Sequence, residues 1–536
     1  VAGDRVQIWV DDTDARWPVH VDPILSTATT SISRSTDADF GLGVTMGGDV
    51  NKDGYVDLLV GARFGVGLYG TAYSYHGSSS GISTTASRSY LSTGYYGKFG
   101  EALDNRGDVN NDGYDDAVIS EFYNEIIYVY HGSSSGLPAS PNTTIYSGSY
   151  GAGRNVAWAG DINNDSYDDL VVASEDDVIV YKGSSSGLNT TGVKTHLGTS
   201  GFTASGAGDV NNDGYADYIY GDSGANRAYV VLGNSSFTGS STTLSSSGAS
   251  YLGETVAGVG DLNGDGYDEV AAADTQYSSA KGRVVVYYGS SSGTRTTGTV
   301  TIDGGSSGLY SGAAIVGAGD VNGDGYDDML IGGYGRVSLY HGSSSGVSTT
   351  ASQTISGGGG TFGFTMGGLR SGADVNKDGF DDVVIGDFGS KTVYVYYGCQ
   401  DADGDGECAP TDCNDSNAAI NTSATEVCDA SNTDEDCDGL TDDSDSSVSS
   451  TGKTRYYKDA DSDGYGDKSD AGSLRCDVNS TYKVTTNTDC NDSSSSISPG
   501  ATEICDSSNT DEDCDSLADN NDSSASSATK TTYYKD

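Results

Sequence analysis

The chain has 536 residues, of which 77 are acidic and 27 are basic, so its formal net charge is −50 at neutral pH. This length exceeds what one hydrophobic core usually organises, so we expect at least two structural units. The acidic balance argues against nucleic acid and anionic membranes as partners, because nothing offsets the phosphate repulsion, and so many carboxylates need cations.

The first residues contain neither an initiator Met nor a signal peptide, and no apolar run approaches the ~20 residues of a membrane helix. The chain opens within the strand-like segment VQIWV, and its last residues, TYYKD, restart a pattern seen at Tyr456. We therefore expect a fragment of a longer protein. Residues 1–23 contain DDTDARWPVHVDP, which resembles the end of a β-domain in bacterial surface proteins, so this segment is expected to end a preceding β-domain or to be a linker.

From residue 24 to 398 one short pattern occurs seven times. In its first copy, GDVNKDGYVDLLVGA, oxygen-bearing side chains stand at positions 1, 3, 5 and 9, and a glycine at position 6 permits a sharp turn. With the carbonyl of position 7 they supply the oxygen shell, at about 2.3 to 2.6 Å, that calcium prefers. A strand follows, and position 12 holds no glutamate, so the pattern is not an EF-hand. A single copy would also fit an Asx-rich turn without metal, whereas seven copies with an acidic position 9 favour metal sites.

The predicted calcium ligands stand at positions 1, 3, 5, 7 and 9 of each loop. In chain order they are Asp49, Asn51, Asp53, Tyr55 and Asp57; Asp108, Asn110, Asp112, Tyr114 and Asp116; Asp161, Asn163, Asp165, Tyr167 and Asp169; Asp209, Asn211, Asp213, Tyr215 and Asp217; Asp261, Asn263, Asp265, Tyr267 and Glu269; Asp320, Asn322, Asp324, Tyr326 and Asp328; Asp374, Asn376, Asp378, Phe380 and Asp382. Loop three has Ser166 at position 6, which costs on the order of 1 kcal/mol if φ is positive there. Loop five ends in Glu269, whose extra methylene shifts its oxygens, so we expect the weakest occupancy in loops three and five.

The seven loops recur every 48 to 59 residues, a period typical of propellers, solenoids or arrays. Each period has room for four short strands and their turns, as in a propeller blade, and closure into a ring would hide the strand edges. The segments DFGLGVTMGGDVNKDGYVDLLVGA (39–62) and KFGEALDNRGDVNNDGYDDAVIS (98–120) resemble the FG-GAP repeats of integrin α-subunits and their bacterial relatives. The resemblance implies an all-β, seven-bladed propeller over residues 24–398, with all the loops on one face and about seven calcium ions.

All nine cysteines lie at or after Cys399, in a segment that carries 32 acidic and 8 basic residues. Their spacings repeat and predict two four-cysteine modules, at 399–452 and 453–536, the second including the start of a truncated third. The expected groups are Cys408, Cys413, Cys428 and Cys437, then Cys476, Cys490, Cys505 and Cys514, with Cys399 left over. Each group allows three pairings, and we expect a disulfide framework because such small modules lack a core.

Further aspartate-rich loops are predicted to bind calcium within these modules. Their ligands are Asp401, Asp403 and Asp405; Asp434, Asp436, Asp438 and Asp442; Asp459, Asp461, Asp463 and Asp467; Asp511, Asp513, Asp515 and Asp519. The pattern DCND…EVCD…EDCDG resembles the metal-binding repeats of bacterial surface proteins and, more distantly, thrombospondin type 3 repeats. Zinc and copper are disfavoured, because there is no CxxC pair, no His after His341 and no Met after Met366.

Several motifs look catalytic or adhesive but are expected to be structural. GSSSG recurs at Gly77, Gly132, Gly183, Gly289 and Gly342, at one place in each repeat, which indicates a turn and not a nucleophile elbow. His76, His131 and His341 precede such turns, at a place that holds Lys182, Leu232, Tyr288 or Tyr397 elsewhere, so they are predicted to be rim residues. Arg106-Gly107-Asp108 spells an integrin-binding tripeptide, but its aspartate is a predicted calcium ligand.

These observations favour a non-enzymatic, extracellular calcium-binding scaffold or adhesion module of a bacterial surface protein, filament or appendage. Its calcium would be structural, and its partners would be proteins or glycans that meet the propeller away from the loops. Two alternatives stay open: the non-catalytic propeller of a larger secreted hydrolase or lyase, and a lectin-type propeller. Only Trp9, Trp17 and Trp158 are tryptophans, which disfavours a repeated Trp-based sugar site.

Overall fold

The structure is a computed structural model that describes residues 28–92, 94, 96–297, 299–357, 359–367, 374–399, 412–422, 424–429 and 431–535. The chain divides into two compact units, Val1–Cys408 and Ala409–Asp536. The segment 1–23, the predicted ligands Asp401, Asp403 and Asp405, and Cys408 lie outside the described residues. Within the described residues, no helix is long and apolar enough to cross a membrane.

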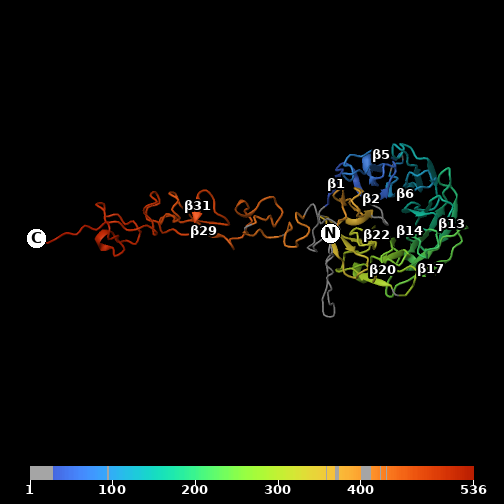
Figure 1. Cartoon of the computed structure of the whole chain (residues 1–536). Helices are drawn as coiled ribbons and strands as arrows, with labels where there is room; N and C mark the ends of the chain where they lie inside the picture. Colours follow the sequence, from blue (N-terminus) through green and yellow to red (C-terminus); the bar gives the residue numbers. More distant parts are fainter. Residues whose placement is uncertain are drawn as a thin grey trace, which may run out of the picture. The chain divides into compact units, whose positions relative to one another are not determined.

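The first unit contains seven four-stranded antiparallel sheets (Figure 1). Six of them order their strands as they occur along the chain. These are β2 (Ala38–Gly48), β3 (Asp57–Phe64), β4 (Thr71–Tyr75), β5 (Arg88–Leu91); β6 (Phe99–Gly107), β7 (Asp116–Glu121), β8 (Ile126–Tyr130), β9 (Thr143–Tyr146); β10 (Asn155–Gly160), β11 (Asp169–Ala173), β12 (Asp177–Tyr181), β13 (Gly192–Leu197); β14 (Phe202–Gly208), β15 (Asp217–Asp222), β16 (Arg227–Val231), β17 (Ser241–Leu244); β18 (Thr255–Gly260), β19 (Glu269–Asp274), β20 (Arg283–Tyr287), β21 (Val300–Asp303); β22 (Ala314–Gly319), β23 (Asp328–Gly333), β24 (Arg336–Tyr340), β25 (Gln353–Ser356).

The seventh sheet combines the two ends of the first unit. Its order is β26 (Phe362–Gly367), β27 (Val383–Asp387), β28 (Thr392–Tyr396) and then β1 (Thr30–Ser33). β1 pairs antiparallel with β28, with Thr30 opposite Val395 and Ser33 opposite Thr392. Short helical turns lie in some connections: α1 (Gly65–Leu68), η1 (Phe122–Asn124), η2 (Ser223–Ala225) and α2 (Tyr277–Ala280).

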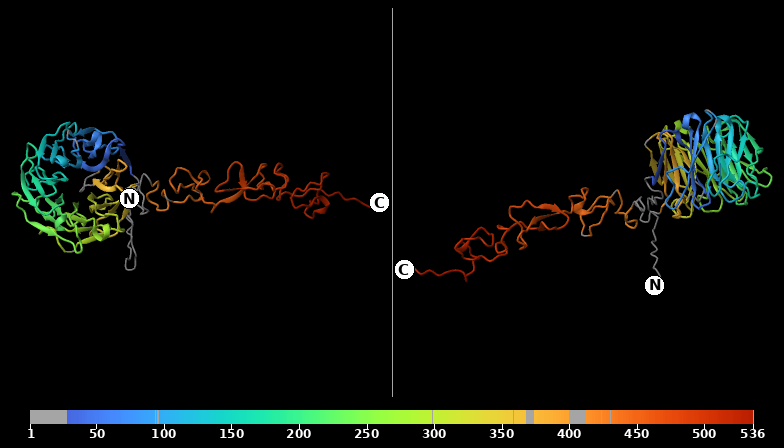
Figure 2. Two further views of the ribbon diagram at one scale, coloured as in Figure 1. Left: turned by 180° about the vertical axis from the view of Figure 1, so that it is seen from behind. Right: turned by 90° about the horizontal axis from the view of Figure 1, so that it is seen from above.

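The second strand of each sheet follows a predicted metal loop directly and is apolar on both faces, as expected for a strand buried between two neighbours. Seven apolar clusters lie between adjacent sheets. One of them combines the first sheet with the seventh, through Phe40, Val60, Val384 and Val395. A cavity of about 410 Å³ is lined by first strands of all seven sheets, through Val44, Leu103, Val156, Ala204, Val256, Ile315 and Phe364. These contacts, and the views in Figure 2, are consistent with a β-propeller.

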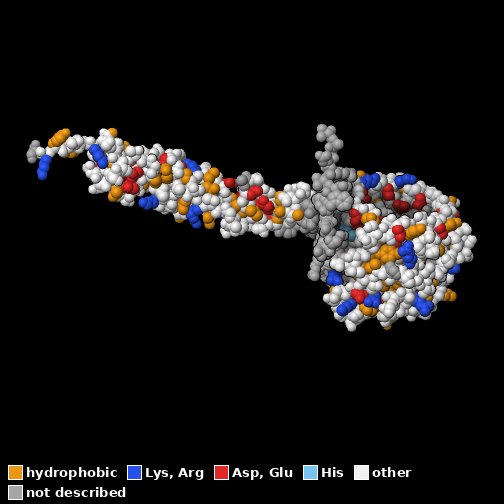
Figure 3. All heavy atoms as spheres, turned by 60° about the horizontal axis from the view of Figure 1, so that its bottom comes forward, with side chains coloured by type: hydrophobic (Ala, Val, Ile, Leu, Met, Phe, Trp, Pro, Cys, Tyr) orange, Lys and Arg blue, Asp and Glu red, His pale blue; other side chains and the backbone are white. Residues whose placement is uncertain are grey.

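The second unit has little regular structure. Its strands β29 (Thr454–Lys458), β30 (Ser473–Arg475) and β31 (Tyr482–Val484) form one sheet in the order β30-β29-β31, and two short helical turns are η3 (Asp442–Ser444) and η4 (Asp519–Asn521). Among its described residues, only Ile420 and Ala525 are buried apolar side chains. Acidic, basic and apolar side chains are interspersed on the face drawn in Figure 3. Since no apolar core is available, cross-links and polar contacts hold the unit together.

Disulfides confirm the expected framework and correct the expected grouping. Cys413 pairs with Cys437, and Cys490 with Cys514. Cys428 pairs with Cys476, a bond that joins the two predicted groups of four. The prediction of two self-contained modules with Cys399 left over is therefore wrong, because Cys399 is itself disulfide-bonded. Among the described cysteines, Cys505 is the free one.

Candidate metal-binding loops

The first loop shows how the sequence pattern folds. Asp49 accepts N–H bonds from Asp53 (3.1 Å) and Gly54 (2.7 Å), one on each carboxylate oxygen. Asn51 Oδ1 also accepts the N–H of Asp53 (2.8 Å), and Asp53 Oδ1 accepts the N–H of Tyr55 (2.9 Å). These bonds draw the side-chain oxygens of positions 1, 3 and 5 toward the inside of one turn, which is the arrangement a hard cation needs.

Five other loops repeat this geometry. In loops two, four, five, six and seven, position 1 accepts from positions 5 and 6, position 3 from position 5, and position 5 from position 7. Loop five follows the pattern despite its glutamate: Asp261, Asp265 and Glu269 offer ligand oxygens within 4.8 Å of one another. Loop five thus shares the geometry of the other loops, and its calcium occupancy stays a prediction.

Position 9 has a second role that the sequence pattern did not reveal. Asp57 is fully buried, and its two oxygens accept the N–H groups of Val50 in its own loop and of Gly77 in the following GSSSG turn, both at 3.0 Å. Burial raises the pKa of Asp57 to about 8, and it raises the pKa of Asp382 to about 8. A carboxylate that is buried beside other carboxylates is stabilised as an anion by a bound cation, so these shifts fit a metal site.

Position 8 joins neighbouring sheets and was missed by the sequence analysis. The backbone N–H of Asp49 donates to Asp115 Oδ2 of the next loop at 2.7 Å. The same contact occurs at four other joints, with Asp168, Asp268, Asp327 and Asp381 as acceptors. Position 8 is Val56 in loop one and Ala216 in loop four, so two joints have no carboxylate there. The signal was an aspartate at a fixed position in five loops, but its partner lies in another repeat.

Loop three departs from the shared geometry. Ser166 has a φ of 71°, which confirms the expected left-handed conformation at position 6. Asn163 donates its Nδ2 to Asp169 Oδ2 at 3.1 Å, a contact that the other described loops do not make. The ammonium of Lys182 lies 2.5 Å from Asp165 Oδ2.

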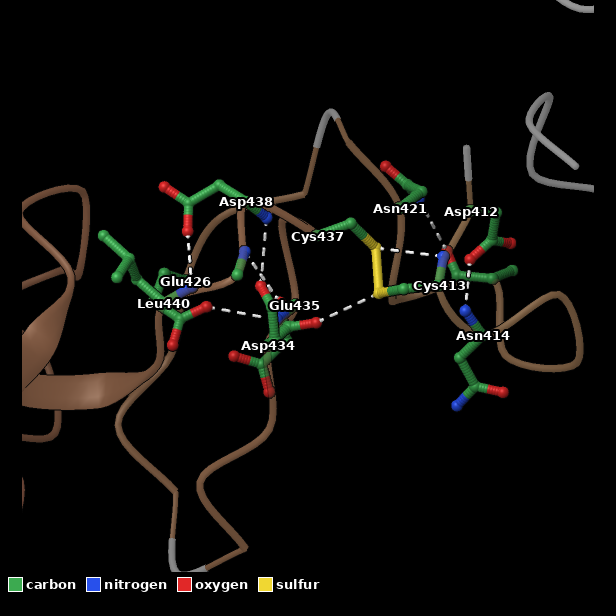
Figure 4. Close-up of a disulfide and its surroundings, with 12 residues drawn as sticks. Asp412, Cys413, Asn414, Asn421, Glu426, Asp434, Glu435, Cys437, Asp438 and Leu440 are labelled. Carbon is green, nitrogen blue, oxygen red and sulfur yellow. Dashed lines mark hydrogen bonds between the residues drawn. A yellow bond between two sulfur atoms is a disulfide. The ribbon is translucent and has the colours of Figure 1, made fainter. Parts of the chain in front are cut away.

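In the second unit, two predicted loops fold in the same way as each other. Asp434 accepts the N–H groups of Asp438 (3.2 Å) and Gly439 (3.0 Å), and Asp438 accepts that of Leu440 (2.8 Å), as Figure 4 shows beside the Cys413–Cys437 bond. Asp511 and Asp515 make the equivalent contacts. In the third predicted loop, Asp459 accepts N–H groups from Ser462 and Gly464, and Asp463 accepts that of Tyr465.

Buried acidic residues missed by the sequence analysis lie beside these loops. Glu426 is fully buried and accepts the N–H groups of Glu435 (3.1 Å) and Asp442 (2.7 Å). Glu426, Asp436 and Asp445 offer ligand oxygens within 4.8 Å of one another, so Asp436 groups with two acidic residues outside the predicted set. Glu503 makes the contacts of Glu426 in the second module. The repeated EVCD and EICD motifs carried the signal, but their glutamate stands outside the DxDxDG pattern.

The catalytic-looking motifs are structural. In the GSSSG turn at Gly132, Ser133 Oγ donates to the carbonyl of Gly136 at 2.7 Å, a turn-closing bond that recurs in other repeats. Arg106 of the RGD tripeptide donates to both oxygens of Asp104 at 2.7 Å. Burial lowers the pKa of His341 to about 4, and this ring contacts Asn322.

Comparison with known proteins agrees with this geometry. Residues 108–172, 161–220, 209–272 and 261–331 match the family described as "FG-GAP-like repeat", and residues 412–443 and 489–520 match "Putative metal-binding motif". Chicken integrin alpha-6 is 31% identical over 159 residues, and chicken integrin alpha-8 is 33% identical over 174; each match covers 28% of this chain and 14% or 16% of the relative. The chain therefore spans about a sixth of these relatives or less. The Raptor structure of Chaetomium thermophilum aligns over 71% of this chain and 29% of its own, with 11% identity and a TM-score of 0.45.

Proposed function

We propose that this chain, which carries FG-GAP-like repeats of the integrin alpha type followed by a metal-binding motif, is a non-enzymatic binding scaffold stabilised by calcium. The first unit is a closed seven-bladed propeller that presents a partner-binding face. The second unit is a metal-binding, disulfide-linked segment of a larger surface protein or filament. The observation that carries the proposal is the shared geometry of six loops, in which oxygens of positions 1, 3 and 5 converge above a buried acidic position 9.

Ring closure is supported by contacts between the two ends of the first unit. β1 completes the seventh sheet, and one apolar cluster packs that sheet against the first. A closed ring leaves no open sheet edge for pairing with other chains. It also places every first strand around one central cavity, as the lining of the 410 Å³ cavity indicates.

Calcium is favoured over other metals by the donor set. The loops offer carboxylate, amide and backbone oxygens, which suit calcium, and none of the predicted ligands is a cysteine or histidine. Each ion would bridge a loop whose position 9 is already bonded to the following turn, so binding would stiffen the sheet beneath it. Calcium would therefore act on stability and not on chemistry.

The partner-binding face is expected at the end of the sheets opposite the metal loops. Because each sheet is an antiparallel meander, the connections between its second and third strands, and those leading to the next sheet, lie at that end. Exposed tyrosines lie in these connections, namely Tyr69, Tyr96, Tyr123, Tyr150, Tyr251 and Tyr334, and Tyr146 ends strand β9 beside them. Tyrosine is enriched at protein interfaces and also stacks on sugars, so a protein partner and a glycan both fit this face. The tyrosines keep the lectin-type alternative open.

An extracellular location fits the disulfides, which persist in oxidising compartments, and the integrin-like repeats. Display at a bacterial surface and assembly into a fibre are parts of the proposal that rest on the resemblance of the repeats. A role as the non-catalytic propeller of a larger secreted enzyme would use the same face and the same calcium.

Thermal melting of the full chain with calcium, with magnesium and with chelator tests the proposal. A site held at one hundred times its Kd stabilises the folded state by about 2.7 kcal/mol, so calcium should raise the midpoint well above that in chelator. Magnesium should substitute poorly, because it demands a smaller octahedral shell. A midpoint that is the same in calcium and chelator would refute calcium as the structural ion. Binding of the full chain to a glycan array, with and without a Tyr123→Ala change, then separates the glycan partner from the protein partner.

A further inference from the structure

The first inference concerns loop three and rests on the proposed calcium binding of the other loops. In those six loops, the position 3 amide oxygen accepts the N–H of position 5, as Asn211 does for Asp213 at 3.0 Å. The position 5 carboxylate in turn accepts the N–H of position 7, as Asp213 does for Tyr215 at 3.0 Å. These two bonds aim the second and third side-chain ligands at a common point.

In loop three both ligands turn elsewhere. Asn163 presents its Nδ2 to Asp169, and the opposite orientation would place its amide oxygen against a carboxylate that can only accept. Asp165 turns its Oδ2 to Lys182, whose ammonium lies 2.5 Å away, and its buried Oδ1 has no hydrogen-bond partner. Two of the five ligands that a cation would need are therefore engaged, and Ser166 stands in a left-handed conformation that glycine occupies in the other loops.

Lys182 has no counterpart among the other repeats. The residue before each of the other turns is His76, His131, Leu232, Tyr288, His341 or Tyr397, and none of these is a lysine or arginine. The lysine thus brings a fixed positive charge to the one loop with a different ligand geometry. An ammonium supplies a single charge and three donors, which suffices to hold one carboxylate but not to gather five oxygens.

We propose that loop three takes no divalent cation and that the ammonium of Lys182 serves as its cation, so the propeller holds six calcium ions. Loop three then keeps its structure when calcium is removed, whereas the other loops lose theirs. The joint beside it, which lacks a position 8 carboxylate because Ala216 stands there, is the joint where calcium contributes least.

The test counts calcium ions bound to the full chain by native mass spectrometry and follows hydrogen exchange in chelator. Asp165→Asn should leave the number of bound ions unchanged, whereas the matched Asp213→Asn in loop four should lower it by one. The double variant Lys182→Met, Ser166→Gly should gain one ion, and Leu232→Met at the same place in the next repeat should gain none. Chelation should speed exchange at residues 209–217 and leave residues 161–169 unchanged.

Two results would overturn the inference: loss of one ion in Asp165→Asn, or no gain in the double variant. If the unmodified chain binds no calcium in the propeller, the proposed function fails instead. The two failures are distinguishable because loop four serves as the internal reference for calcium binding.

A second inference rests on a different observation, the repeat of the second unit. Residues 412–452 and 489–529 make matching contacts 77 positions apart, including the Cys413–Cys437 and Cys490–Cys514 bonds and the backbone bonds to Glu426 and Glu503. The two modules are therefore copies of one design, and each contact in the first has an expected counterpart in the second.

One group of contacts is present only in the first copy. Cys428 bonds to Cys476, which follows β30, and Asp443 pairs with Arg475 at 3.1 Å and with Lys453 at 3.8 Å. These residues attach the sheet β29–β31 to the first module. In the second copy the equivalent of Cys428 is Cys505, a free thiol.

Thr529 lies next to Cys505, whose backbone N–H donates to the Thr529 hydroxyl oxygen at 3.1 Å, and the lysine that follows differs in exposure between the copies. Lys530 is exposed, whereas Lys453 is partly buried. Cys505 thus stands at the place that, in the first module, is cross-linked to a sheet.

We infer that Cys505 is half of a module-to-module disulfide and that its surface accepts a sheet of the β29–β31 design carrying a cysteine at the place of Cys476. The bond forms by exchange: two thiols lose two protons and two electrons to a small-molecule disulfide, which leaves as two thiols. At the place of Asp443 the second copy has Asn520, an uncharged residue that cannot pair with an arginine.

The test appends a copy of residues 460–489 after Asp536 of the full chain and maps disulfides by non-reducing peptide analysis in glutathione buffer. Cys505 should link to the appended cysteine, and Asn520→Asp should speed the linkage by restoring the ion pair. A copy with serine in place of its single cysteine is the control, in which Cys505 should stay reactive to maleimide. A free Cys505 in the intact tandem, or a link to any other cysteine, would overturn the inference.

Discussion

The joint between the fifth and sixth sheets offers a direct measure of what position 8 contributes. Asp327 Oδ2 accepts the backbone N–H of Asp261 at 2.8 Å, and the N–H of Asp327 donates back to the carbonyl of Asp261 at 3.2 Å. Asp327→Ala removes the first bond and keeps the second. The change leaves the amide of Asp261 without its acceptor at a partly buried position.

The expected loss follows from two opposing effects. A hydrogen bond to a charged group contributes about 1.5 to 3 kcal/mol. Burial and the neighbouring carboxylates Asp268, Asp381 and Asp261 raise the pKa of Asp327 to about 6, so removing its charge relieves some repulsion. We therefore expect a net local loss of about 1 to 2 kcal/mol, which corresponds to roughly 5- to 30-fold faster exchange of the Asp261 amide.

Hydrogen exchange of the full chain, read at peptides that contain Asp261, is the assay. Asp327→Asn is the matched control, because the asparagine Oδ1 can still accept the N–H of Asp261. Its effect on the free energy of opening at Asp261 should be less than half of the effect of Asp327→Ala. Peptides around Asp161 provide an internal reference, because the neighbouring position 8 residue is Ala216 and offers no carboxylate to the Asp161 amide. Equal exchange at Asp261 in the alanine variant and the unmodified chain would refute a stabilising role for the Asp327–Asp261 hydrogen bond.

Three further changes test other parts of the structure. Asp382→Asn should lower the free energy of unfolding by about 1 to 3 kcal/mol even in chelator, because the buried amide can accept only one of the two N–H bonds from Val375 and Gly398. The exposed Asp378→Asn is the control and should lower stability only when calcium is present. Equal effects of the two changes in denaturant titrations would contradict this account. Burial lowers the pKa of His196 to about 4, so the contribution of the neutral ring to stability is complete above about pH 6.5 and is lost as the pH falls toward 4. His196→Phe should therefore flatten the decline of the melting midpoint over this pH range. An unchanged decline would contradict the role given to His196. Ser166→Gly should stabilise the chain by about 1 kcal/mol in the same denaturant titration, because glycine adopts the φ of 71° at no steric cost, and a destabilised variant would contradict this account.

The sequence predicted those parts of the site that are encoded within a few residues. Positions 1, 3 and 5 alternate along one loop, so their convergence follows from the local turn, and the structure has it in six loops. The repeat spacing likewise predicted sheets of four strands. The hydrogen bond made by the position 8 carboxylate could not be found in this way, because Asp115 and the N–H that it binds lie 66 residues apart.

The cysteines show a related limit. Equal spacings suggested two closed groups, yet the Cys428–Cys476 bond spans 48 residues and links one module to the next. A periodic sequence reports the period and not the point at which one structural unit ends. The geometry of loop three could not be foreseen for a different reason, since Lys182 lies outside the loop pattern and its contact with Asp165 joins residues 17 positions apart.

The positions of the metal loops and of the exposed tyrosines constrain how calcium can influence binding. The loops lie at one end of the sheets, and the tyrosines in connections at the other, so no calcium ion in a loop would touch a partner on the tyrosine face. Calcium would therefore change affinity only through the order of the sheets between the two ends. Since position 9 joins each loop to the turn below it, and position 8 joins five loops to their neighbours, we expect disorder in one loop to spread first to the neighbouring loops and then along the strands. A partner of the tyrosine face should accordingly lose affinity gradually as calcium is removed, and a change such as Asp213→Asn in one loop should weaken binding without altering which partner is chosen.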